Sequence, residues 1–264
     1  MYEELYQRIP DLDAYMERIQ MQREEVCNED YLDRLVFAHQ CAIPFENLDV
    51  RKGKSIELGI EHLFDKIVRK RRGGYCFEMN ALFCQFLVDC GFKAYGCRSR
   101  IVRGKDFVPP VLHRGTLVEL EDGLYYCDVG YGGPQPGGSI KVEDGAVKDV
   151  AGQTYRITKT DQYWWTMSRA VKTGWEDIMQ FTTMPQVNVD FIAINAYCSM
   201  HPDSVFVQKT LLNRRLPNGS IALTDRVFTK FVNGEHIEEV IADQGRYVEV
   251  IETEFGIPDA ENLI

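Results

Sequence analysis

Two hydrophobic stripes with helical spacing mark the first 90 residues. The first stripe consists of apolar residues three or four positions apart, namely Ile60, Leu63, Phe64, Ile67 and Val68. This spacing predicts an amphipathic helix. The basic run Arg69–Arg72 follows, where cations favour the negative end of a helix, and Gly73–Gly74 then predict its end.

A second apolar stripe begins directly after these glycines. Its members are Met79, Leu82, Phe83, Phe86, Leu87 and Cys90. They predict a second helix, which begins near Cys76 and ends at Gly91.

From about residue 94 the pattern changes to short runs typical of strands. HRGTLVELE and LYYCDVG flank Asp122–Gly123, which is a strong hairpin signal. Residues 139–183 predict further strands and turns. Near the end of the chain, SIALTDRVFTKFV predicts strands and GEHIEEVIADQ predicts a helix. The chain therefore has a helical start, a β-rich middle and a mixed tail, which is an α+β pattern.

Charge and hydropathy narrow the classes of partner and compartment. The 264 residues carry a formal net charge of -10, which disfavours binding to nucleic acid or to an anionic membrane. No charge-poor apolar run reaches the roughly 18 residues of a membrane span. The first residues are acidic and lack the basic start and apolar middle of a signal peptide. We therefore expect a cytoplasmic protein.

Cysteine usage points to free thiols. The eight cysteines are Cys27, Cys41, Cys76, Cys84, Cys90, Cys97, Cys127 and Cys198. In a chain of this length with no secretory signal we expect reduced thiols. No CxxC pair occurs and the five histidines lie far apart, so no metal site is predicted.

Cys76 is the candidate nucleophile. A helix N-terminus carries partial positive charge and free N–H groups, which stabilise a thiolate, lower its pKa and hold an oxyanion. Gly73 and Gly74, just before it, let a substrate approach the backbone. The alternative is that Cys76 is only a small apolar residue of the core, because it lies three residues before Met79 and continues the buried stripe.

His113 and Asp128 are the candidate partners of this thiol. With Asp122–Gly123 as a two-residue turn, Asp128 lies opposite Leu117, on the same face as His113. Four residues along a strand still separate them by about 13 Å, so a bulge, a longer loop or strong twist has to close the distance. For an isolated histidine such as His113, a surface residue or a satisfied core residue is the more common role.

Burial supports a role for Asp128. Next to Cys127 and Val129 it is expected to be buried, and a buried carboxylate needs a partner. A histidine is a suitable partner, because the carboxylate fixes its tautomer. His39 and His62 are weaker candidates, since both are predicted on helix surfaces.

The motifs around these residues resemble the arylamine N-acetyltransferases, in their prokaryotic form. IPFENL (43–48) is similar to the family's N-terminal motif, and RGGYCFEMN (72–80) to its nucleophile motif. His113 and DVGYG (128–132) stand where the family has its other triad residues. DFIAINAYCSMHPDSVF (190–206) is similar to the segment that opens the third domain.

The resemblance implies a fold of three domains. Residues 1–90 are expected to form a helical bundle that carries the nucleophile, and residues 91–189 a β-barrel that carries the histidine and aspartate. Together these two domains resemble the core of cysteine proteases. Residues 190–264 are expected to form an α/β lid.

The same resemblance implies a ping-pong reaction. Cys76 attacks the thioester of acetyl-CoA, and the acetyl group passes to an arylamine, arylhydrazine or N-hydroxyarylamine. His113 takes the proton from Cys76, and Asp128 orients His113, in agreement with the chemistry expected of an activated nucleophile. Acetyl-CoA is a co-substrate, and no permanently bound cofactor is implied.

Substrate contacts follow from the resemblance as well. Phe45, Tyr131 and Phe206 match positions that line the acceptor pocket, and a flat apolar pocket suits an aromatic amine. Core packing is the alternative role for each ring. Arg72 and Glu46 match a structural pair.

The CoA contacts implied by the resemblance lie in two loops. Pro109 and Pro110, just before His113, and Gly132 are the residues expected to contact CoA. Its phosphates are expected to meet N–H groups or basic side chains there.

Two rival functions use the same residues. A Cys-His-Asp triad also serves thiol hydrolases and amide synthases, which differ in the acyl acceptor. A binding or scaffold protein that keeps the fold without turnover is the rival from another class. All three triad residue types are present, which favours an enzyme.

Overall fold

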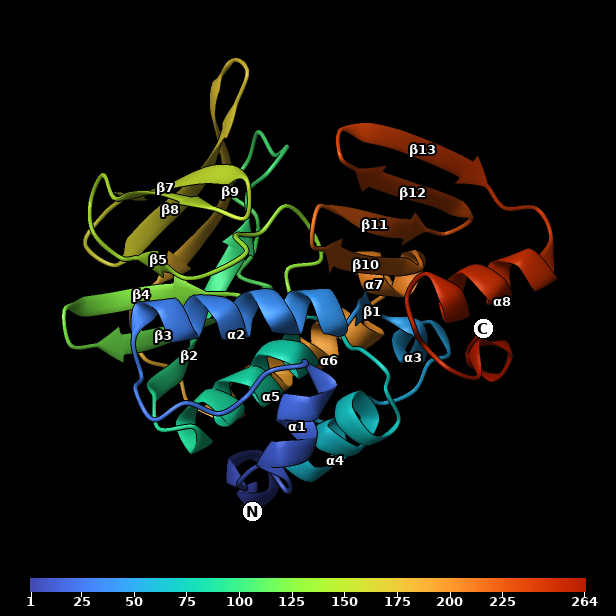
Figure 1. The fold of residues 1–264 in the computed structure, drawn as a ribbon, viewed down its shortest axis with the longest axis horizontal. Coiled ribbons are helices and arrows are strands. Elements are labelled where there is room, and N and C mark those ends of the chain that lie inside the picture. The colour runs from blue at the N-terminus through green and yellow to red at the C-terminus, as the bar shows by residue number, and fades with distance from the viewer.

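Helices occupy the first third of the chain (Figure 1). The computed structural model describes residues 1–264. The elements of this part are η1 (Glu3–Tyr6), α1 (Leu12–Arg18), α2 (Glu29–Ala42), β1 (Phe45–Glu46), α3 (Leu48–Arg51), α4 (Ile60–Phe64), η2 (Asp65–Arg69) and α5 (Cys76–Asp89). Of the 14 residues of α5, 11 are buried, so this helix lies at the centre of the molecule rather than on a face of it.

The middle of the chain forms one antiparallel sheet of eight strands, which is nearly closed into a barrel. The strands lie in the order β5-β4-β3-β2-β9-β8-β7-β6, and β5 also contacts β7. Their bounds are β2 (Lys93–Ile101), β3 (His113–Leu120), β4 (Gly123–Cys127), β5 (Ile140–Lys141), β6 (Val147–Val150), β7 (Gln153–Lys159), β8 (Trp164–Val171) and β9 (Gly174–Thr182). Both β2 and β3 pack against α5, which brings the barrel to the centre of the molecule.

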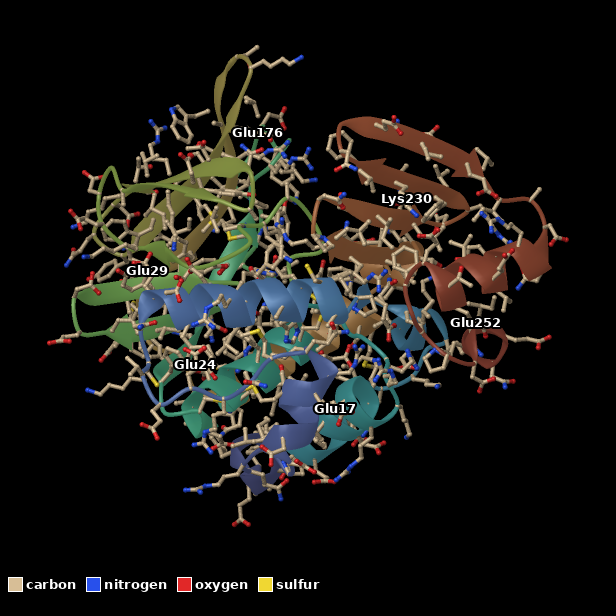
Figure 2. All side chains as sticks on the ribbon, viewed as in Figure 1. Glu17, Glu24, Glu29, Glu176, Lys230 and Glu252 are labelled. Carbon is tan, nitrogen blue, oxygen red and sulfur yellow. The ribbon has the colours of Figure 1, made fainter.

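A second antiparallel sheet follows, and it takes one strand from the N-terminal part. Its order is β1-β10-β11-β12-β13, with Phe45 of β1 paired to Asn213 of β10. The elements after the barrel are η3 (Asn188–Phe191), α6 (Ile192–Met200), α7 (Val205–Gln208), β10 (Leu211–Leu216), β11 (Gly219–Thr224), β12 (Val227–Val232), β13 (Glu235–Val240), α8 (Gln244–Thr253) and η4 (Ala260–Leu263). Lys230, labelled in Figure 2, forms an ion pair with Glu254, the residue directly after α8, and so ties β12 to the end of this helix.

Helix α2 connects the two sheets. Figure 1 shows it running from the barrel at one end to β1 at the other. On the barrel side Lys148 bridges Glu29 and Asp33 of α2, and at its other end α2 contacts β10. The helical part therefore positions the barrel and the second sheet relative to each other.

Most of the predicted elements are confirmed. The second hydrophobic stripe is α5, and Gly91 with φ +106° ends it as expected. The first stripe forms α4 but continues as η2, a π-helical turn. Residues 139–183 form strands, as predicted.

The helix predicted for GEHIEEVIADQ is wrong. Residues 235–240 form β13, and the helix begins only at Gln244. Asn233 and Gly234 both have positive φ, +53° and +85°, which is the geometry of a tight hairpin turn. This turn fixes β13 against β12 and overrides the helical spacing of the apolar residues.

The α+β class is confirmed as a mixed fold of helices and sheets with a nearly closed eight-stranded barrel. The division into three domains at residues 90 and 189 stays a prediction. No helix combines the length and the apolar character needed to cross a membrane.

The prediction of His39 on a helix surface is wrong. Its side chain is fully buried, with Nδ1 2.9 Å from the Tyr15 hydroxyl and the ring against Phe83. Burial, together with the charge of Arg18, lowers the pKa of His39 from 6.5 to about 3. The folded protein therefore keeps this imidazole neutral.

The titration of His39 predicts a loss of stability in mild acid. Below pH 6.5 the unfolded chain binds a proton that the folded protein does not, so stability present above pH 6.5 is lost as pH falls toward 3. Between pH 7.5 and 5.5 this amounts to about 1.4 kcal/mol. Urea denaturation at both pH values measures the free energy of unfolding. Between pH 7.5 and 5.5 the wild type is expected to lose more of this free energy than His39→Gln, and the difference is expected to equal this amount. Equal losses in the two proteins would contradict the prediction.

Candidate functional site

The backbone before Cys76 is held by close contacts. Tyr75, with extended φ and ψ, precedes α5, and its N–H donates to Glu78 Oε2 at 3.1 Å. A Cβ atom on Gly73 would lie 1.9 Å from the Pro44 carbonyl oxygen, so only glycine fits there. Gly74 pairs with Phe45 of β1. Cys76 is therefore the first residue of α5, as predicted.

The environment of the Cys76 thiol differs from the expectation of a lowered pKa. Its side chain is buried, and this burial, with Cys198 and Asp128 nearby, raises the pKa of the thiol well above its usual value. The backbone N–H groups of Arg114 and Phe77 act in the opposite direction but do not outweigh burial. At neutral pH this thiol needs a base to take its proton.

His113 and Asp128 meet in the structure. His113 Nε2 lies 2.5 Å from Asp128 Oδ2, and both side chains are buried. The strand register explains how. Thr116 pairs with Cys127, so the loop is Glu121–Asp122, one residue earlier than predicted. Continued by one pair, this register sets Asp128 beside Gly115, only two residues from His113 rather than four.

The absence of a side chain at Gly115 makes this approach possible. A Cβ atom at Gly115 would lie 2.4 Å from the hydroxyl oxygen of Tyr126. The Tyr126 ring thus occupies the space above Gly115 that a side chain would need, and its hydroxyl donates to Asp128 Oδ2 at 2.9 Å. The predicted common face is confirmed, and the distance that the sequence left open is closed.

Asp128 accepts four hydrogen bonds. His113 and Tyr126 donate to Oδ2, while Asn80 Nδ2 and the Gly130 N–H donate to Oδ1, both at 2.8 Å. Burial alone would raise the pKa of Asp128, but His113, Asn80 and Gly130 lower it below its usual value. The carboxylate is therefore ionised at neutral pH, and His113 Nε2 must donate to it.

Asn80 is a site residue that the sequence reasoning did not single out. Besides Asp128 it contacts the carbonyl oxygen of Arg114 through Nδ2, and its Oδ1 accepts the N–H of Val129. It lies four residues after Cys76 on α5, and residues at this spacing share one helix face. That spacing was the signal that could have found it.

Cys76 lies close to this cluster. A Cβ atom on Gly130 would be 2.8 Å from Cys76 Cα and 2.9 Å from Asn80 Nδ2, so the backbone after Asp128 passes directly over the start of α5. The Cys76 sulfur and His113 are not joined by a hydrogen bond in this structure. The structure brings the histidine and aspartate into contact, and the thiol next to them.

Aromatic rings cluster around Tyr75 and His113. The Phe206 ring lies 5.3 Å from Tyr75 and 6.2 Å from Phe45, as measured between ring centroids. Tyr131 lies against His113 at 6.1 Å. Of the three rings predicted from the sequence, Tyr131 contacts His113, while Phe45 and Phe206 pack together beside Tyr75, the residue before Cys76.

A cleft of about 850 Å³ lies between the barrel and the second sheet. Three arginines line it, Arg103 and Arg169 from the barrel side and Arg215 from β10. Glu176, labelled in Figure 2, pairs with both Arg103 and Arg169. Gly132 also lines the cleft, and a Cβ atom there would lie 2.8 Å from the Phe45 ring.

Pro109 and Pro110 do not line this cleft. Pro109 is buried and Pro110 is exposed, in the loop before β3. Of the three residues expected to contact CoA, only Gly132 borders the cleft, and all three contacts stay predictions. No group of three or more histidine, cysteine, aspartate or glutamate side chains is arranged to hold a metal ion.

Comparison with known proteins places this chain in a family. A family model described as N-acetyltransferase matches residues 29–264. The arylamine N-acetyltransferase of Escherichia coli K12 is 32% identical over 251 residues, which cover 94% of this chain and 89% of that protein. The chain belongs to the arylamine N-acetyltransferase family. It is therefore an acyltransferase.

Solved structures of this family share the fold. The arylamine N-acetyltransferase from Mycobacterium tuberculosis superposes with a TM-score of 0.89 at 31% identity, over 96% of each chain. The enzyme of Mycobacterium marinum, solved in complex with CoA, gives 0.89 at 29% identity over 96% of this chain and 95% of that one.

Proposed function

We propose that this arylamine N-acetyltransferase family member transfers an acetyl group from acetyl-CoA, through Cys76, to an arylamine, arylhydrazine or N-hydroxyarylamine. The observation that carries the proposal is the buried His113–Asp128 hydrogen bond beside a thiol at a helix N-terminus. In this proposal residues 1–90 and 91–189 form a core like that of cysteine proteases, and residues 190–264 form a lid.

The first half-reaction loads the thiol. Because burial raises the pKa of Cys76, His113 has to take the proton as the thiol attacks the thioester carbonyl. Asp128 stabilises the imidazolium that forms. The N–H groups of Phe77 and Arg114, which favour charge on the sulfur, are positioned to favour charge on the adjacent oxyanion. CoA leaves as a thiol with the proton from His113.

The second half-reaction discharges the acetyl group. The neutral amine attacks the carbonyl of acetyl-Cys76, and His113 takes the proton that the amine loses. The Cys76 thiolate is then expelled and regains a proton from His113, which completes the cycle.

The aromatic rings support an aromatic acceptor. Tyr131 offers an apolar ring against His113, and Phe45 and Phe206 form a cluster with Tyr75, the residue before Cys76. Rings favour offset or edge-to-face packing with an aromatic substrate. An arylamine also remains neutral near pH 7, which is the form that attacks.

The cleft supports binding of an anionic donor. Arg103, Arg169 and Arg215 give it positive charge in a chain whose net charge is -10, although Glu176 compensates part of the charge of the first two. Guanidinium groups recognise phosphate by paired hydrogen bonds. Gly132 borders both the cleft and the Phe45 ring, so a ligand in the cleft lies next to the proposed acceptor pocket.

Intact-mass measurement tests the proposal. Incubation with acetyl-CoA is expected to add one acetyl group, mapped to Cys76, and an aromatic amine is expected to discharge it as the N-acetyl product. An alkyl amine of similar size serves as the control acceptor and is expected to react more slowly. An adduct lost to water as fast as to the aromatic amine, or cleavage of a peptide or amide with no adduct, would instead indicate a hydrolase.

A further inference from the structure

A buried cluster of charged side chains lies behind the start of α5. At its centre, Lys66 Nζ is 2.7 Å from Glu78 Oε1 and 2.8 Å from Asp49 Oδ2, with only 8% of the side chain exposed. Arg72 pairs with Glu46 at 2.7 Å and with Asp49 at 3.1 Å. Removal of one partner from such a cluster leaves buried charge without compensation.

An irregular helical turn carries Lys66. The π-helical turn η2 (Asp65–Arg69) ends with the Lys70 N–H donating to the Asp65 carbonyl at 2.8 Å. The Arg72 N–H donates to the carbonyl of Lys66 itself at 3.0 Å. Turns of this kind occur frequently at functional sites. This one lies directly before Gly73–Gly74 and the proposed nucleophile.

Glu78 links Lys66 to the backbone of Cys76. Its Oε2 accepts the Tyr75 N–H, while its Oε1 contacts Lys66. A Cβ atom on Gly74 would lie 2.8 Å from Glu78 Cβ and 2.9 Å from Oε2, so the side chain packs against Gly74. One carboxylate thus fixes both residues that precede Cys76.

The charge of Glu78 depends on its neighbour. Burial raises the pKa of Glu78, and the ammonium of Lys66 opposes that effect. Glu46 acts in the same direction as burial. A protonated carboxyl group is a weaker acceptor for the Tyr75 N–H than a carboxylate.

We propose that Lys66 is a positioning residue for the nucleophile: its ammonium group holds the Glu78 carboxylate where it anchors the Tyr75 N–H and so fixes the backbone that carries Cys76. The inference rests on the proposed role of Cys76. It gives the buried cluster a function in thiol reactivity in addition to any contribution to stability.

The surroundings of the cluster define the groups that bear on its test. Beside it lies a small cavity of about 180 Å³. The titratable side chains that line this cavity are Asp49, Lys54, His62, Asp65, Lys66, Lys70, Arg72 and Glu78. The groups that influence Cys76 itself, Cys198 and Asp128, lie outside that lining.

The test is the rate at which iodoacetamide alkylates Cys76, followed by mass spectrometry across pH. Lys66→Met is expected to slow alkylation at pH 7 by about tenfold to a hundredfold, because a small displacement at a reactive group has effects of this size. Its pH profile is expected to gain a step from Glu78, because loss of the ammonium group raises the pKa of this carboxyl further. In Lys66→Met/Glu78→Gln the uncharged amide oxygen still accepts the Tyr75 N–H, so the extra step disappears and most of the rate returns.

Lys148→Met is the matched control. Lys148 also bridges two carboxylates, Glu29 and Asp33, but it connects α2 to β6. This variant is expected to lose stability and keep the wild-type alkylation rate and pH profile. Wild-type kinetics in Lys66→Met, or a double variant with the same slow rate and extra step, would overturn the proposal.

Variants of Glu78 keep the proposal testable if Lys66→Met does not fold. Glu78→Gln retains an acceptor for the Tyr75 N–H and is expected to react within about twofold of the wild type, whereas Glu78→Ala loses the anchor and is expected to be slowed about tenfold. Equal rates in these two variants would overturn the proposal. Alkylation requires no acetyl-CoA, so a failure of the proposed acetyl transfer would not be confused with a failure of this inference.

Discussion

Cys76→Ala is expected to lower the rate of acetyl transfer by at least about a thousandfold, because removal of a nucleophile eliminates the covalent route. No acetyl adduct is expected on the intact protein. The side chain is buried and small, so the variant is expected to fold. Product formation, intact mass and far-UV circular dichroism together check the prediction.

Cys84→Ala is the matched control for this variant. Cys84 lies two turns further along α5 and is also buried, with 7% of the residue exposed. It should keep both the adduct on Cys76 and the transfer to an aromatic amine. An acetyl adduct on another cysteine in Cys76→Ala, with transfer retained, would assign the nucleophile elsewhere.

The hairpin shows how far a strand pattern can lead. Alternation predicts that His113 and Asp128 share a face, and this is independent of a shift by two residues in the pairing. The distance between the two side chains does change with such a shift, because it depends on which two residues make the turn. The pattern does not decide between Asp122–Gly123 and Glu121–Asp122. The structure selects the second, with Tyr126 filling the space above Gly115.

The thiol shows where local reasoning misses a global effect. The position of Cys76 at a helix start follows from Gly73–Gly74 and the apolar stripe after it. The pKa of the thiol does not follow from this local sequence, because the barrel strands and α6 that bury the side chain come from later in the chain. Asn80 depends on both local sequence and tertiary structure. Its position on the helix face follows from its spacing from Cys76, whereas its contact with Asp128 requires the folded barrel.

The end of the chain shows two sequence signals in conflict. Ile237, Val240 and Ile241 have helical spacing, while Asn233–Gly234 indicates a hairpin. A short turn decides the outcome because β12 offers a complete row of hydrogen-bonding partners to residues 235–240. The helix begins only after Asp243, whose side chain accepts the Arg246 N–H as an N-cap.

Asp128→Asn is the second variant with a large expected effect. It is expected to lower the rate of acetyl-Cys76 formation by about a thousandfold to ten-thousandfold. Asn80 and Gly130 already donate to one oxygen of this side chain, so the amide nitrogen of the variant must face His113 Nε2. Nε2 of His113 then has to accept a hydrogen bond from this amide, so the imidazole proton moves to Nδ1. A protonated Nδ1 cannot take the proton of Cys76.

The pH dependence of this variant separates a catalytic defect from a folding defect. With no competent base, the thiol has to ionise unaided, and burial raises its pKa. The residual rate of acetylation is therefore expected to keep rising with pH above the range in which the wild type has levelled off. A misfolded protein shows no such recovery.

Tyr126→Phe provides the matched control, because it removes one donor to Asp128 Oδ2 and leaves the carboxylate and the His113 contact in place. Loss of one hydrogen bond to a charged group costs about 1.5–3 kcal/mol at most. Because His113 still donates to the same oxygen, the rate is expected to fall by no more than about tenfold. The prediction is contradicted if the rate of acetyl-Cys76 formation falls no further in Asp128→Asn than in Tyr126→Phe. The carboxylate would then only support packing, and the base that activates Cys76 would not depend on it.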